Sequence, residues 1–187
     1  MMSENEKLII VDSNDIPIGY EDKITTHSYG LLHRAFSIFI YDPNRKRMLI
    51  QKRAMCKYHS GGLWSNSCCS HMLLGKSEIE VIKDSLQREL GIRNTFINSI
   101  KLGENLFFCG KFSYCVDYEN LSENEIDNVF LIHMNSNQEV SINKSEVETY
   151  QWIDIDKLIK WKEDHITNFS AWFSQALELV LIKLKMR

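Results

Sequence analysis

A mixed α/β fold of the α+β class is predicted by three features of this chain. Several short stretches alternate apolar and polar residues, which is typical of half-buried strands. Two longer stretches repeat apolar residues at helical spacing, and one of them is bounded by capping signals. Strands covered by two helices build layers around one core, so we expect a single domain over residues 1–187.

The alternating stretches place the strands. Strands are expected at residues 8–11, 34–41, 48–53, 125–134 and 147–153, with a turn-rich connection at 12–19. In the second of these, Phe36, Ile38 and Ile40 share one face. The turn formers Asp42 and Pro43 follow it directly, so the second and third strands are expected to pair as a hairpin.

The two helices are expected at residues 77–90 and from residue 170 to the end. Ser77 and Glu80 fit a capping box, and Gly91 stands where a helix C-cap belongs. The apolar stripe of the first helix is Ile79, Ile82, Leu86 and Leu90, and that of the second is Phe173, Leu177, Val180, Leu181 and Leu184. Glu89 lies at the edge of the first stripe and can therefore face inward.

Charge and hydropathy exclude several functional classes. The net charge is −3 and the pI is about 6.1, so the chain lacks the basic footprint of a nucleic-acid-binding protein. No apolar run approaches the ~18 residues of a membrane-spanning helix, so no membrane insertion is expected. The first residues carry acids where a secretory signal carries bases. A cytoplasmic protein is therefore expected.

The five cysteines are better explained as free thiols than as a disulfide framework. Their number is odd and no C-x-x-C pair occurs. In a reducing compartment such residues are most often small buried hydrophobes. A cysteine with a chemical role must therefore be recognised by its neighbours.

Two pairs of reactive side chains are spaced by two residues. Cys69 and His71 point to the same side of an extended segment, where an imidazole or a metal eases ionisation of the thiol. Glu123 and Glu125 have the same spacing, and two carboxylates on one face need solvent, a shared proton or a cation. Taken alone, Cys69 and His71 are more commonly two ordinary buried residues. Taken alone, Glu123 and Glu125 are more commonly part of a solvated loop that runs into a strand.

Further polar residues extend these pairs into a candidate metal and anion site. A five-ligand set is formed by His27, His33, His71, Glu123 and Glu125, which suits Mn²⁺ or Zn²⁺. Lys23, Arg53 and Lys57 are cations of the kind that clamp phosphate. Trp64 and Trp172 could face a cation, although Trp more often fills a core.

Taken together, these segments resemble the type I isopentenyl-diphosphate isomerases, a family with a Nudix-like fold. The matching segments are HSYGLLHRAF (27–36), LIQKRAMCKYHSGGLWSNSCCSH (49–71), LLGKS (73–77), ELG (89–91), SENEI (122–126) and FSAWF (169–173). The resemblance implies an α/β/α sandwich with a mixed sheet. It also implies an isomerase of isoprenoid biosynthesis that interconverts isopentenyl and dimethylallyl diphosphate by protonation and deprotonation through a carbocation.

The resemblance assigns roles to individual residues. It implies that Cys69 and Glu125 transfer protons, that Tyr114 hydrogen-bonds the glutamate, and that Trp172 faces the isoprenoid carbons. It further implies that the diphosphate is bound by Lys23, Arg53 and Lys57. Glu89 is implied to help hold Mg²⁺ on that diphosphate. One further ion, Mn²⁺, Zn²⁺ or Mg²⁺, is implied to be bound by His27, His33, His71, Glu123 and Glu125. The expected partner is a small isoprenoid diphosphate, bound by a monomer or weak homodimer.

Two other functions compete with this interpretation. A Nudix hydrolase shares the expected fold, but its helix carries several glutamates around Mg²⁺, and the run DSLQRELG at residues 84–91 keeps only Glu89. A non-enzymatic module with structural zinc would favour four ligands rich in Cys, often with C-x-x-C spacing, which this chain lacks. Release of phosphate would identify the first, and unfolding on metal removal the second.

Overall fold

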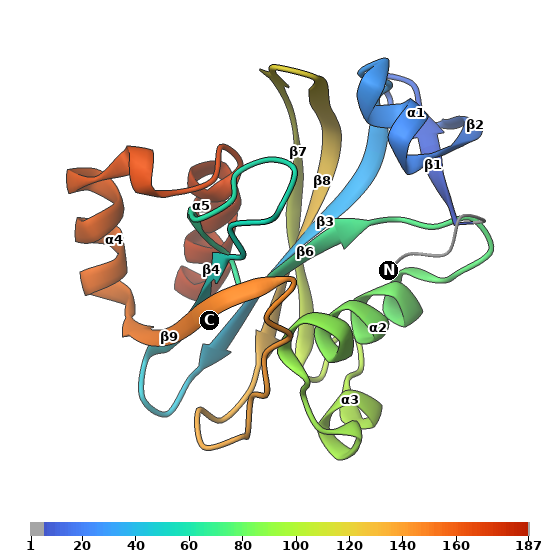
Figure 1. Cartoon of the computed structure of the whole chain (residues 1–187). Coiled ribbons are helices and arrows are strands. Elements are labelled where there is room, and N and C mark those ends of the chain that lie inside the picture. Colours follow the sequence, from blue (N-terminus) through green and yellow to red (C-terminus); the bar gives the residue numbers. More distant parts are fainter. Residues whose placement is uncertain (1–5, 187) are drawn as a thin grey trace.

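A nine-stranded mixed sheet forms the centre of the molecule (Figure 1), as seen in a computed structural model that describes residues 6–186. Residues 1–5, which carry part of the expectation about a secretory signal, lie outside the described residues. The strands are β1 (Lys7–Val11), β2 (Pro17–Asp22), β3 (His33–Asp42), β4 (Arg47–Arg53), β5 (Trp64–Ser65), β6 (Cys68–His71), β7 (Leu106–Tyr118), β8 (Leu121–His133) and β9 (Val147–Asp154). Strand β3 is central because it pairs with β1, β4, β6 and β8.

Helices cover both faces of this sheet. They are α1 (Lys23–Ser28), α2 (Glu78–Leu90), α3 (Asn94–Ser99), α4 (Ile155–Asp164) and α5 (Phe173–Lys185), with a 3₁₀ turn at Ile166–Asn168. Helices α2 and α3 lie on one side of the strands, and α4 and α5 on the other (Figure 1). The expected α/β/α sandwich is therefore confirmed. Among the described residues, no helix combines the length and apolarity needed to span a membrane.

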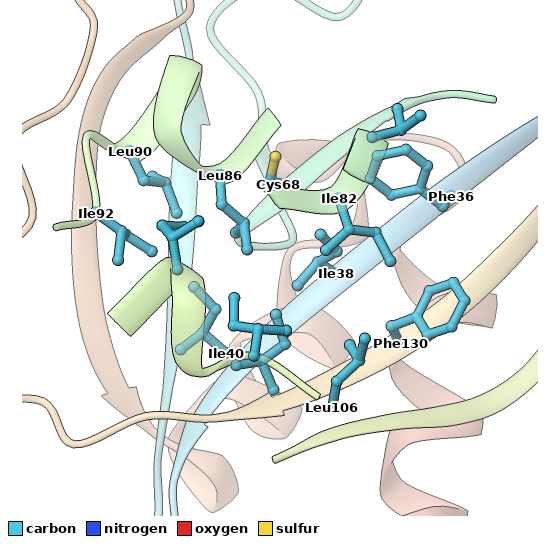
Figure 2. Packing of buried hydrophobic residues seen from close by; sticks show 14 of the residues in the cluster. Phe36, Ile38, Ile40, Cys68, Ile82, Leu86, Leu90, Ile92, Leu106 and Phe130 are labelled. Atoms are coloured by element: carbon cyan, nitrogen blue, oxygen red, sulfur yellow. The ribbon is translucent and has the colours of Figure 1, made fainter. Parts of the chain in front are cut away.

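Successive side chains of a strand point to opposite faces of the sheet, so the core has two halves. Phe36, Ile38 and Ile40 of β3 pack against Ile82, Leu86 and Leu90 of α2 (Figure 2). Alternate residues of the sheet face the other way, and their cluster contains Phe39, Val129 and Leu131 together with Phe173, Ala176, Leu177 and Val180 of α5. Burying a side chain of this size contributes about 1.5–3 kcal/mol, so these two layers hold the strands that carry the site in place.

Helix α2 has the ends that the sequence predicts. The Ser77 backbone N–H donates to Oε2 of Glu80 at 2.8 Å, and the Glu80 backbone N–H donates to Oγ of Ser77 at 3.4 Å. Gly91 ends the helix in the left-handed region at φ 55°, where a Cβ would lie 2.2 Å from the Ser141 carbonyl oxygen. The helix therefore holds Glu89, in its last turn, at a defined place on the sheet.

Four expectations of the secondary structure need correction. The turn-rich segment 12–19 is partly strand, because β2 begins at Pro17. Strand β8 begins at Leu121 rather than at residue 125 and places Glu123 inside the sheet. Helix α5 begins at Phe173 rather than at residue 170, because the Ser170 backbone N–H donates to the Trp64 carbonyl and holds that segment extended. The molecule also has five α-helices in its described part, not two.

Candidate active site

One cavity of about 530 Å³ is lined by residues from both halves of the molecule, including Glu89 of α2 and Trp172 just before α5. Its floor comes from β3, β6 and β8, and its walls come from α1, the loop 54–63 and the segment before α5. Most of the residues singled out by the sequence line this cavity: Lys23, His27, Arg53, Lys57, Cys69, His71, Glu89, Tyr114, Glu123, Glu125 and Trp172.

Strand register brings the reactive pairs together. Strand β8 runs parallel to β3, so the Cα atoms of Glu125 and His33 are direct partners. Strand β6 is antiparallel to β3 and sets His71 opposite Ala35, two residues from His33. Because alternate residues share a face, these side chains project into the same volume.

Three imidazoles meet two carboxylates in this volume. The ring centroids of His27, His33 and His71 lie 5.0 Å apart in all three pairs. Nε2 of His27 lies 3.2 Å from Oε1 of Glu123. Nε2 of His33 and Nε2 of His71 lie 3.3 Å and 3.1 Å, respectively, from Oε1 of Glu125. One ligand atom from each of the five residues lies within 4.8 Å of all the others.

The backbone fixes which nitrogen of two of these histidines faces the cluster. Nδ1 of His27 lies 2.6 Å from the Lys23 carbonyl oxygen, and Nδ1 of His33 lies 2.8 Å from that of Leu31. A nitrogen hydrogen-bonded to a carbonyl oxygen carries a proton, so Nε2 is the nitrogen that faces the cluster. Helix α1 positions His27, and the Asp22 carboxylate caps that helix by accepting from the Thr25 backbone N–H at 2.9 Å.

The donor set fits a divalent cation. Nε2 of His27, Nε2 of His33 and Oε1 of Glu123 are buried and lack an aligned hydrogen-bond partner in the described part of the chain. Burial lowers the pKa of His71 to about 3, so its imidazole is neutral near pH 7. Three imidazoles and two carboxylates are a suitable set for Mn²⁺, Zn²⁺ or Mg²⁺. His27 therefore belongs with the other four residues.

Cys69 and Glu125 line the same cavity with opposite protonation tendencies. Burial raises the pKa of the Cys69 thiol to about 12, although Arg53, whose Nη1 lies 3.6 Å from Sγ, partly offsets this. Burial and Glu123 would raise the pKa of Glu125, but contacts with His33 and His71 outweigh them and lower it. At neutral pH the site therefore presents a protonated thiol and an ionised carboxylate.

Tyr114 and Trp172 line the same cavity. The Tyr114 hydroxyl donates to Oε2 of Glu125 at 2.6 Å. The Trp172 indole N–H donates to Oδ1 of Asn66 at 2.9 Å, which fixes the ring in the cavity wall 6.0 Å from the Tyr114 ring. The Arg53 guanidinium lies 5.3 Å from the Trp172 ring.

Three cations, Lys23, Arg53 and Lys57, form a cationic part of the cavity that adjoins Cys69. Arg53 is 5% exposed, and burial lowers the pKa of Lys23, whose Nζ lies 4.6 Å from the Tyr58 ring. Nζ of Lys57 donates to Oε2 of Glu146 at 2.5 Å. A group of cations taken partly out of water binds a polyanion more strongly than solvated lysines do.

Glu89 lies beside these cations. Its Oε2 accepts from Nε2 of Gln51 at 3.1 Å, and burial raises its pKa. Helix α2 thus presents one carboxylate to the cavity, as the edge of its apolar stripe predicts.

Of the candidate residues named in the sequence analysis, His33 and Trp64 do not line the cavity, and neither does Cys68, the neighbour of Cys69. Trp64 packs on the Trp161 ring at 5.3 Å between centroids and belongs to the core next to α5. Cys68 faces the opposite side of the sheet from Cys69 and is part of the core under α2 (Figure 2).

The cavity also contains residues that the sequence analysis missed. They are Ser37, Tyr58, His59, Arg88, Asp127 and Glu146. Asp127 continues the two-residue spacing of Glu123 and Glu125, so that signal was present. Tyr58 and His59 lie in an irregular loop, where no periodicity indicates which side chains face inward.

Known proteins resemble this chain over most of its length. A family profile for the NUDIX domain matches residues 31–173. An isopentenyl-diphosphate Delta-isomerase of Burkholderia multivorans is 37% identical over 173 residues, which cover 92% of this chain and 92% of that protein. An isopentenyl-diphosphate Delta-isomerase 2 of Photorhabdus laumondii is 36% identical over 173 residues, covering 92% and 91%. A crystal structure of a Deinococcus radiodurans protein shares the fold with a TM-score of 0.68 at 13% identity, covering 93% and 97%.

Proposed function

The chain belongs to the NUDIX family and, within it, to the isopentenyl-diphosphate Delta-isomerases, and from this membership we propose that Cys69 and Glu125 are its two proton-transfer groups. The enzyme interconverts isopentenyl diphosphate and dimethylallyl diphosphate by protonation and deprotonation in isoprenoid biosynthesis. The observation that carries the assignment is that a neutral thiol and an ionised carboxylate line one cavity.

The reaction needs one group to give a proton and another to take one. Protonation of the alkene produces a tertiary carbocation, and loss of a proton from the neighbouring carbon produces the isomer. A thiol that resists ionisation is suited to hold a proton in an apolar cavity, and a carboxylate is suited to accept one. In the reverse direction these two roles exchange between the groups.

Neighbouring side chains protect and orient the reacting groups. The Tyr114 hydroxyl holds one oxygen of Glu125 and directs the other toward the histidines. The Trp172 ring offers a π face that can stabilise positive charge without forming a bond to the carbocation. A cavity that excludes water also keeps the cation from being trapped as an alcohol.

The five-residue cluster supports binding of a divalent ion beside Glu125. His27, His33, His71, Glu123 and Glu125 would hold it, with Mn²⁺, Zn²⁺ and Mg²⁺ as the candidates. When bound, the ion adds positive charge next to Glu125 and lowers the proton affinity of its carboxylate. The contacts of Nδ1 with backbone carbonyls keep His27 and His33 oriented for this task.

The diphosphate is assigned to the cationic part of the cavity. Lys23, Arg53 and Lys57 line it and would bind the phosphate oxygens, while Glu89 would share Mg²⁺ with them. Binding energy from this remote group can hold the small hydrocarbon in register with Cys69 and Glu125.

Three variants test the assignment. We expect Cys69→Ala and Glu125→Gln each to abolish conversion of isopentenyl diphosphate while circular dichroism and thermal unfolding stay near wild type. Cys68→Ala is the matched control, because Cys68 is the adjacent thiol but faces the core under α2. It should keep its activity and lose about 1 kcal/mol of stability. Full activity in Cys69→Ala would overturn the assignment.

Hydrolysis of a diphosphate is the second candidate, since the NUDIX profile itself is compatible with it. Helix α2 argues against it, because Glu89 is the one cavity-lining glutamate of this helix. A hydrolase would crowd several carboxylates there to bind Mg²⁺ and activate water. Incubation with isopentenyl diphosphate should therefore release neither phosphate nor pyrophosphate above the no-enzyme rate.

A further inference from the structure

We propose that His59 is a positioning residue that orients the Glu123 carboxylate as a ligand and links the metal cluster to the loop 54–63. This rests on the proposed metal cluster and adds to it a fourth imidazole, which is not one of its five ligands. His59 reaches the cluster through Glu123: its Nε2 lies 2.9 Å from Oε1 of that carboxylate.

The loop holds the imidazole in an enclosed position. Although the loop 54–63 is irregular and partly exposed, His59 is only 8% exposed. Its ring lies between those of Tyr58 at 4.6 Å, Tyr118 at 5.2 Å and Trp172 at 5.8 Å, measured between centroids. Aromatic rings at such distances pack favourably in edge or tilted geometries. The ring of His59 therefore has little room to turn.

Hydrogen bonds on the other side of the ring favour one tautomer. Nδ1 of His59 lies 3.3 Å from Oγ of Ser60, and this hydroxyl lies 3.0 Å from the Tyr118 hydroxyl. If Tyr118 donates to Ser60 and Ser60 donates to Nδ1, the ring proton is left on Nε2, facing Glu123. Nη2 of Arg53 also donates to the His59 carbonyl oxygen at 3.4 Å. The imidazole is thus presented to Glu123 as an N–H donor.

This donor matters because both near imidazoles approach the same oxygen of Glu123. Nε2 of His27 lies 3.2 Å from Oε1, and Nε2 of His59 lies 2.9 Å from it. When the lone pair of His27 serves as a ligand, His59 is the imidazole left to donate to this carboxylate. Oε1 is buried and has no aligned hydrogen-bond partner within residues 6–186, and Nε2 of His59 lies within reach of it. Such outer contacts fix ligand orientation and typically change metal affinity by about 10- to 100-fold.

The same contact couples the cluster to the loop. The loop carries Lys57 and Tyr58 at the cationic part of the cavity and His59 at the cluster. A metal that orders Glu123 should therefore also slow opening of the loop, and linkage requires the loop to affect metal affinity by the same factor. The loop therefore contributes side chains both to the cationic part of the cavity and to the metal cluster.

Metal titration of the metal-depleted full chain tests this directly. We would measure unbound Mn²⁺ by electron paramagnetic resonance for wild type, His59→Phe, His59→Gln and His59→Asn. The Phe variant keeps the ring packing without a donor and should bind Mn²⁺ about 10- to 100-fold more weakly. The Gln amide can reach the carboxylate and should restore the affinity to within about threefold, whereas the shorter Asn should not. His165→Gln, at an exposed histidine outside the cavity, is the matched control and should bind as wild type.

Hydrogen exchange supplies a second readout. Mn²⁺ should slow exchange of peptides covering 54–63 at least about fivefold in wild type and in His59→Gln, but not in His59→Phe. Circular dichroism of the metal-depleted proteins checks that each variant folds. If His59→Phe does not fold, the comparison of Gln with Asn still decides the question.

The outcomes separate this proposal from the assignment of the ligands. If His59→Phe binds Mn²⁺ as tightly as wild type, while Glu123→Gln binds it weakly, the role of His59 is refuted and the cluster stands. Equal weakening in His59→Phe and His59→Gln would also refute it, because it would indicate packing rather than donation. If wild type binds no Mn²⁺, or Glu123→Gln binds it normally, the ligand assignment fails and this proposal fails with it.

Discussion

The Tyr114 hydroxyl donates a 2.6 Å hydrogen bond to Oε2 of Glu125 across the β7–β8 hairpin. The two residues are direct Cα partners in the antiparallel ladder, so the backbone register sets this contact. The other oxygen of Glu125 faces His33 and His71. One carboxylate thus joins the cavity wall to the histidine cluster, and its orientation decides where a proton can be taken up.

Replacing Tyr114 by Phe should lower kcat with little effect on KM for isopentenyl diphosphate. The change removes one hydrogen bond to a charged group, worth about 1.5–3 kcal/mol, so kcat should fall roughly 10- to 100-fold. Steady-state kinetics would measure both constants. Tyr150→Phe, on β9, is the control and should leave kcat unchanged. A rise in KM alone would mean that Tyr114 serves substrate binding instead.

Trp172 should act through its ring face rather than its N–H. Both Trp172→Phe and Trp172→Leu lose the bond to Asn66, but only Phe keeps an aromatic face. A desolvated cation–π contact is worth about 2 kcal/mol, so kcat of the Leu variant should lie roughly 30-fold below that of the Phe variant. Equal kcat values in the two variants would show that the ring only fills space.

The Cys69 thiol should resist alkylation far above neutral pH. Alkylation requires the thiolate, and raising the pKa from 9 to about 12 reduces the thiolate fraction at pH 8 roughly a thousandfold. The rate should therefore keep rising with pH beyond 9 instead of levelling off there. Peptide mass spectrometry after iodoacetamide would follow it, with the exposed Cys56 and Cys115 as internal references. Cys69 labelling as fast as these two at pH 8 would contradict the prediction.

Local signals explain how far the fold could be predicted. The capping box at Ser77 and the left-handed Gly91 define α2 almost to the residue, because both signals act within one turn. Strand β7 was not expected, although Phe112, Tyr114 and Val116 alternate with more polar residues beyond the register shift between Phe108 and Gly110. Helix α1 has only six residues, too few to show a period.

The site was predictable in pairs but not as a whole. The spacing of Cys69 with His71 and of Glu123 with Glu125 predicts two shared faces, and both occur. That His33 lies beside Glu125 depends on the parallel pairing of β3 with β8, and no local pattern encodes that register. The family resemblance supplied this convergence. His59 had no such signal, because a loop has no period.

Isomerisation in D₂O tests the central claim most directly, namely that protons pass through Cys69 and Glu125 in a cavity beside a bound cation. Isopentenyl diphosphate, enzyme and Mg²⁺ would be incubated in D₂O and the products followed by NMR and mass spectrometry. Proton exchange through these groups predicts deuterium in dimethylallyl diphosphate and in the recovered isopentenyl diphosphate, with no label entering in Cys69→Ala or Glu125→Gln. Unlabelled dimethylallyl diphosphate formed at the normal rate would contradict the account.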